Sequence, residues 1–113
     1  MKTIEHLIPM EAGKKFNEMV TADTNIFTSE LVGICSPTLM RIYICLNTST
    51  KLHLKRTEGI TTITEYLNSD ADLSANCSYI FDVFLCSPQK INLQVTADCT
   101  ILSLQVVEIP MVQ

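Results

Sequence analysis

With 113 residues, the chain is long enough to bury one hydrophobic core without disulfides or metal, and we expect one domain over residues 1–113. Its formal net charge of −4 argues against a nucleic-acid binder that depends on neutralising phosphates. Charged residues make up only 18% of the chain, so much of the surface must be neutral, which leaves room for protein–protein contacts.

The first residues do not resemble a signal peptide, because Glu5 lies where such a peptide would have its apolar core. No apolar run approaches the roughly 20 residues that a membrane-spanning helix needs. We therefore expect a protein that has no membrane span and folds in the cytoplasm.

Residues 1–20 allow more than one interpretation. Residues 3–8 have the character of a short strand ended by Pro9. Residues 11–20 place apolar side chains at helical spacing but have Gly13 in the first turn, so a short helix and an irregular strand are equally favoured. The whole segment is expected to be an N-terminal arm or a first strand. Weak alternation predicts the next strand over residues 26–31.

Two later runs are apolar on both faces apart from one charge each: residues 39–46, interrupted by Arg41, and residues 79–85, interrupted by Asp82. Short runs that are rich in β-branched and aromatic residues are typical of strands buried on both sides. Apolar and polar residues alternate in further segments, which predicts strands over residues 51–56, 60–67, 90–95 and 99–109.

These seven or eight short strands, with turns every eight to twelve residues, predict an all-β fold. The connections are too short for parallel crossovers, so the pairing should be antiparallel. We expect a single antiparallel β-sandwich or jelly-roll-like barrel with its core strands between residues 26 and 109, and a possible short helix or arm before them.

No constellation of residues predicts catalysis or cofactor binding. His6 and His53 lack a nucleophile or carboxylate partner at a recognisable spacing, and no glycine-rich phosphate loop occurs. The five cysteines form no C-x-x-C pair, so we expect reduced thiols and no metal site. Most of the cysteines lie in or beside apolar strands and are interpreted as small buried hydrophobes: Cys35, Cys45, Cys86 and Cys99.

Two polar segments have sharper alternatives. The outward row Lys51, His53 and Lys55 is interpreted as a solvated sheet face, or else as a contact for an acidic neighbour. The loop 68–78 is interpreted as a plain acidic loop, with a calcium site as the alternative, although the EF-hand pattern is absent. With Tyr66 and Tyr79 nearby, this loop would also be the natural site of a carbohydrate-binding module.

The sequence has more apolar strand faces than one sandwich interior can bury. Some outward faces must then be covered, and another copy of the same chain is the simplest cover. Arg41 and Asp82 would form a buried ion pair or face such an interface. We expect a homo-oligomer whose interface includes residues from the two-sided strands: Arg41, Tyr43, Phe84, Ile101 and Val107.

A family resemblance covers the last two-thirds of the chain. The residues that carry it are Leu52-x-Leu54-x-Arg56-Thr57, Thr61-Thr62-x-Thr64-Glu65-x-Leu67-Asn68, Leu73-x-Ala75-Asn76-x-x-Tyr79-x-Phe81-Asp82-Val83, Ile91-Asn92-Leu93-Gln94 and Thr100-Ile101-Leu102-x-Leu104-x-Val106-x-Glu108-Ile109. In this order they resemble small β-sandwich proteins encoded in the structural-gene clusters of tailed phages and archaeal viruses. The resemblance implies a non-enzymatic virion subunit of the capsid, decoration or tail-associated type, which contacts its own copies and other virion proteins.

Overall fold

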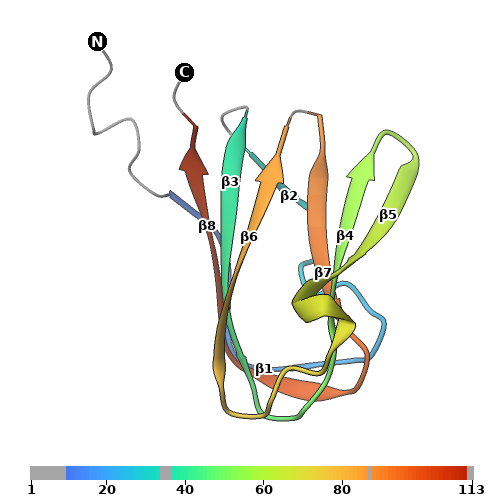
Figure 1. Cartoon of the computed structure of the whole chain (residues 1–113), viewed down its shortest axis with the longest axis vertical. Coiled ribbons are helices and arrows are strands. Elements are labelled where there is room, and N and C mark those ends of the chain that lie inside the picture. The colour runs from blue at the N-terminus through green and yellow to red at the C-terminus, as the bar shows by residue number, and fades with distance from the viewer. Residues whose placement is uncertain (1–9, 34–36, 87, 112–113) are drawn as a thin grey trace.

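The computed structural model describes residues 10–33, 37–86 and 88–111, which form two antiparallel four-stranded sheets packed together (Figure 1). Sheet A contains, in spatial order, β1 (Met10–Val20), β8 (Cys99–Pro110), β3 (Thr38–Leu46) and β6 (Ser78–Leu85). Sheet B contains β2 (Leu31–Val32), β7 (Lys90–Val95), β4 (Leu52–Glu58) and β5 (Thr61–Tyr66). The predicted antiparallel β-sandwich is confirmed.

The strands are wound as one folded ribbon. The first strand pairs with the last, β2 with β7, β3 with β6, and β4 with β5. Successive strands therefore pass back and forth between the sheets, and only β4 and β5 form a hairpin within one sheet. This is the strand order of a jelly roll, in which two sheets enclose one core.

Strand β1 decides between the alternatives for residues 11–20, where the helical interpretation is wrong. Its backbone pairs with β8 from Met10 to Val20, and this long ladder outweighs a weak helical pattern. Gly13 lies at a register shift in the ladder, where a Cβ atom would come within 2.8 Å of the Phe27 ring. The strand suggested for residues 3–8 lies outside the described residues.

The strand predicted over residues 26–31 is also wrong, because only Leu31 and Val32 form β2. The chain between β1 and β2 crosses from sheet A to sheet B, and a crossing segment cannot stay in either ladder. Ile26 and Phe27 are nevertheless buried, at 5% and 7% exposure, and pack on the core.

Inward and outward side chains alternate along the central strands, and the inward ones form the core between the sheets. Inward side chains of β3, β4 and β7 are almost fully buried, whereas their neighbours along β3 and β4 are half-buried or exposed. Inside a sandwich these apolar side chains supply most of the stabilising free energy. The core residues with at most 1% exposure are Met40, Ile42, Ile44, Leu46, Leu52, Leu54, Leu73, Leu85, Ile91, Leu93, Val95, Ile101, Leu104 and Val106.

Asn92 is a buried polar residue that holds the crossing segment in place. Its Oδ1 accepts a hydrogen bond from the Phe27 amide at 3.0 Å, and its Nδ2 donates to the Phe27 carbonyl at 2.8 Å. The side chain thus replaces a missing strand partner for one residue, and no water is needed to satisfy these buried backbone groups.

We predict that Asn92→Leu destabilises the fold by roughly 2–4 kcal/mol, because the Phe27 amide and carbonyl lose their partners while remaining buried. The matched control is Asn25→Ala, which removes an exposed bond to Gln94 and should cost under about 0.5 kcal/mol. Urea unfolding curves measure both values. Equal stability of Asn92→Leu and the wild type would show that this bond pair is dispensable.

Candidate functional site

The outward surface of β6, β3 and β8, which we call the outer face of sheet A, carries several apolar side chains. The strand register arranges its side chains in three rows across the strands. The three rows, each written from β6 through β3 to β8, are Phe84–Leu39–Ile109, Asp82–Arg41–Val107 and Ile80–Tyr43–Gln105.

Apolar side chains on this face are accessible to solvent. Phe84 and Ile80 are each 60% exposed and Tyr43 is 38% exposed, although the inward side chains of the same strands fill the core. Single exposed apolar residues are common on protein surfaces, but clusters on one regular face are typical of an interaction surface.

One ion pair lies in the middle row. Arg41 Nε donates to Asp82 Oδ1 at 2.8 Å and Nη2 donates to Oδ2 at 3.0 Å, so the guanidinium binds the carboxylate with both arms. This hydrogen bonding holds the pKa of Asp82 below its ordinary value and raises the pKa of Arg41. Both side chains are partly exposed, so the pair contributes little to folding stability and faces outward rather than into the core.

Four of the five predicted interface residues lie on the outer face of sheet A, namely Arg41, Tyr43, Phe84 and Val107. Ile101 does not, and its assignment to an interface is corrected. A register shift opposite Cys45 and Leu46 adds a residue to β8 and turns the fully buried Ile101 inward. Ile80, Leu39 and Ile109 were missed, although each lies two residues from a predicted or charged outward position.

The basic row on β4 and the acidic loop meet within the chain. The 3-10 turn η2 (Leu67–Asp70) brings Asp70 Oδ1 to 3.0 Å from His53 Nε2 and Oδ2 to 3.5 Å from Lys51 Nζ. The hydrogen bond from His53 is the main reason that the pKa of Asp70 is lowered. Asp70, an acidic residue of the loop for which calcium was the alternative, thus contacts two basic groups of the chain. Across the described residues, no three His, Cys, Asp or Glu side chains cluster closely enough to hold a metal ion.

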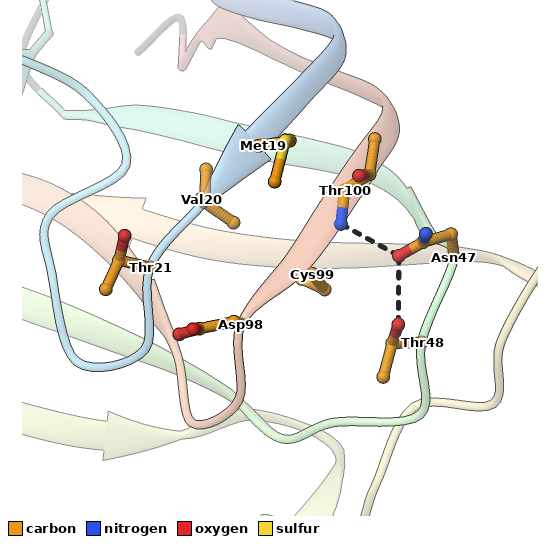
Figure 2. Close-up of a pocket in the computed structure, with 8 residues that line it drawn as sticks. All are labelled: Met19, Val20, Thr21, Asn47, Thr48, Asp98, Cys99 and Thr100. Carbon is orange, nitrogen blue, oxygen red and sulfur yellow. Dashed lines mark hydrogen bonds between the residues drawn. The ribbon is translucent and has the colours of Figure 1, made fainter.

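A small pocket of about 270 Å³ lies where β1 ends, β3 ends and β8 begins (Figure 2). Asn47 Oδ1 accepts hydrogen bonds from the Thr100 amide at 2.8 Å and the Thr48 hydroxyl at 3.0 Å. Asp98 Oδ1 accepts one from the Ala22 amide at 2.7 Å. These lining groups already have partners within the chain, so the pocket presents polar and apolar surface rather than a reactive group.

The thiols follow the prediction only in part. Cys99 is buried, as expected, but Cys45 is only half-buried, and Cys86 is exposed because it lies just past the end of β6. Cys77 is also exposed, and Cys35 lies outside the described residues. Burial raises the pKa of the Cys99 thiol, with the Asp98 charge as a smaller cause, so the thiol stays protonated and is a poor nucleophile.

We predict that a maleimide reagent at neutral pH labels Cys77 and Cys86 well before Cys99. The first two thiols are open to solvent, whereas Cys99 is buried and protonated. Mass spectrometry of the labelled peptides gives the order. Labelling of Cys99 as fast as that of Cys77 would contradict the burial described above, and the unfolded chain supplies the control in which the order disappears.

We predict that Arg41→Met raises the pKa of Asp82 toward the ordinary value of 3.8. Asp82 then loses the hydrogen bonds that favour its charged form, so it takes up a proton at higher pH. Carbon NMR of the carboxyl group across an acid titration gives the value. Lys55→Met is the control, since Lys55 bonds to Thr64 and should leave Asp82 unchanged. An unaltered pKa in Arg41→Met would exclude this pairing in solution.

In residues 10–33, 37–86 and 88–111, no helix is both long enough and apolar enough to span a membrane. Comparisons of the chain with protein-family models, curated proteins and solved structures find no match.

Proposed function

We propose that the protein is a non-enzymatic structural subunit of a virus or virus-like particle, and that it assembles with copies of itself through the outer face of sheet A. One observation carries the self-association. Ile80 and Phe84 are each 60% exposed on a regular sheet whose inward side chains already fill the core. Complete burial of a fully exposed side chain of this size is worth about 1.5–3 kcal/mol before the cost of association, so a second surface that covers this face gains part of this value from each side chain.

The virion assignment has separate support. The jelly-roll winding is shared by many viral capsid domains, and the family resemblance over the last two-thirds of the chain points in the same direction. One fold serves many functions, so the winding alone is weak support for a structural role. The apolar side chains on the outer face of sheet A are the more specific support, because a structural subunit must contact other subunits. Other virion proteins are further expected partners, and the net charge of −4 disfavours direct contact with nucleic acid. The subunit would fold in the host cytoplasm and end in the virion.

A second candidate is a binding module for carbohydrate or a receptor, which the pocket in Figure 2 favours. Jelly rolls also occur in lectins, and the pocket offers threonine and asparagine side chains suited to hydroxyl groups. The chain contains no tryptophan on which a sugar ring would stack. A glycan array tests this candidate directly, and an array without a hit removes the carbohydrate version.

We predict that light scattering after gel filtration under reducing conditions gives a fixed multiple of the 12.6 kDa chain mass. Phe84→Lys should lower this mass toward the monomer, because it places a charge in the apolar surface to be buried. The matched control is Ile63→Lys on β5, whose side chain is 56% exposed and lies on sheet B.

A wild-type monomer at all concentrations would contradict the proposed function. Equal dissociation by Phe84→Lys and Ile63→Lys would instead assign the association to general surface hydrophobicity rather than to sheet A.

A further inference from the structure

We propose that the occupant of the outer face of sheet A is a second copy of the chain, related to the first by a two-fold axis that runs parallel to the strands between β3 and β6. This inference rests on the proposed function, because it specifies how the self-association takes place. The carrying observation is that the part of the outer face formed by β3 and β6 becomes complementary to itself under this rotation, whereas β8 lies beyond the edge of the partner's sheet.

The charges supply the first argument. Arg41 and Asp82 are directly opposite in neighbouring strands, and both point outward. Rotation about the proposed axis places β3 over β6 of the partner subunit. Arg41 then lies over Asp82 of the partner subunit, and Asp82 lies over Arg41 of the partner subunit. Four alternating charges form one group, in which every carboxylate is close to two guanidinium groups.

A two-fold axis across the strands lacks this match. An axis that runs across the strands through the Asp82–Arg41 row would place each arginine over the other arginine and each aspartate over the other aspartate. Such contacts between like charges cost several kcal/mol and discriminate against the wrong arrangement. Since Arg41 and Asp82 already bind each other within one chain, the proposed arrangement buries no charge without a partner.

The apolar rows supply the second argument. Under the same rotation Leu39 faces Phe84 of the partner subunit, and Tyr43 faces Ile80 of the partner subunit. The charged row is therefore flanked on both sides by contacts between apolar side chains. Because the axis is parallel to the strands, the two facing sheets keep roughly the same strand direction, as sheets packed face to face usually do. One patch serves both copies, which is the property of a closed two-fold interface.

Charge reversal in two separate chains tests whether the charged rows of the two copies meet across the interface. Arg41→Asp gives a face with two acids, and Asp82→Arg gives a face with two bases. Each variant alone should repel its own copy and raise the dimer dissociation constant by roughly 100-fold. An equimolar mixture should form a mixed dimer with affinity within about 10-fold of the wild type, because acids then face bases across the interface. The double variant R41D/D82R is the control and should associate like the wild type.

Native mass spectrometry of the mixture identifies the mixed dimer, since the two chains differ in mass, and light scattering gives the affinities. A wild type that stays monomeric overturns the proposed function itself. A wild type that associates while neither single variant weakens it overturns the two-fold arrangement alone. Dissociation of both single variants without recovery in the mixture also overturns it, because the charges then do not meet across the interface.

Circular dichroism first checks that each variant is folded. If Asp82→Arg does not fold, the same experiment is done in the neighbouring row, with Tyr43→Lys in one chain and Ile80→Glu in the other. The proposed axis places these two positions opposite each other, so the mixture should associate more tightly than either variant alone. Failure of this mixture to do so overturns the arrangement equally.

Discussion

The position of β3 between β8 and β6 is the constraint on which the rest of the structure depends. In each pair the register decides which side chains enter the core and which remain outside. Because side chains alternate along a strand, a slip of β3 by one residue would bury Arg41, remove it from Asp82 on β6, and expose Met40 and Ile42. The register that places the apolar side chains in the core therefore also decides which side chains lie on the outer face of sheet A.

Much of this arrangement follows from the sequence, because the strong signals are local. Strand β7 was predicted with its observed bounds, and β3 within one residue, since residue alternation and turns report directly on a half-buried strand. The antiparallel pairing follows from the short connections. The rows on sheet A then follow once the partner strands are known.

The failures have a common physical cause, which is pairing between distant parts of the chain. Strand β1 exists because β8 offers it a ladder, and β8 is about eighty residues away in sequence. Ile101 turns inward because β8 has an irregular register with β3, and no local pattern reveals a bulge. Phe27 is buried although it lies in no strand. The side chain of Asn92 on β7 forms hydrogen bonds with the backbone amide and carbonyl of Phe27, so these groups are satisfied.

The winding of the ribbon also makes sheet A depend on the end of the described chain. Strand β8 lies between β1 and β3, so sheet A is continuous only when β8 is in place. Strand β1 pairs with β8, and the residues that complete the three rows of the outer face, Ile109, Val107 and Gln105, also belong to β8. Contacts so distant in sequence make folding slow, and they also join both ends of the described chain into one cooperative unit. A chain that lacked β8 would leave β1 without its partner strand and would have an outer face made of β6 and β3 alone.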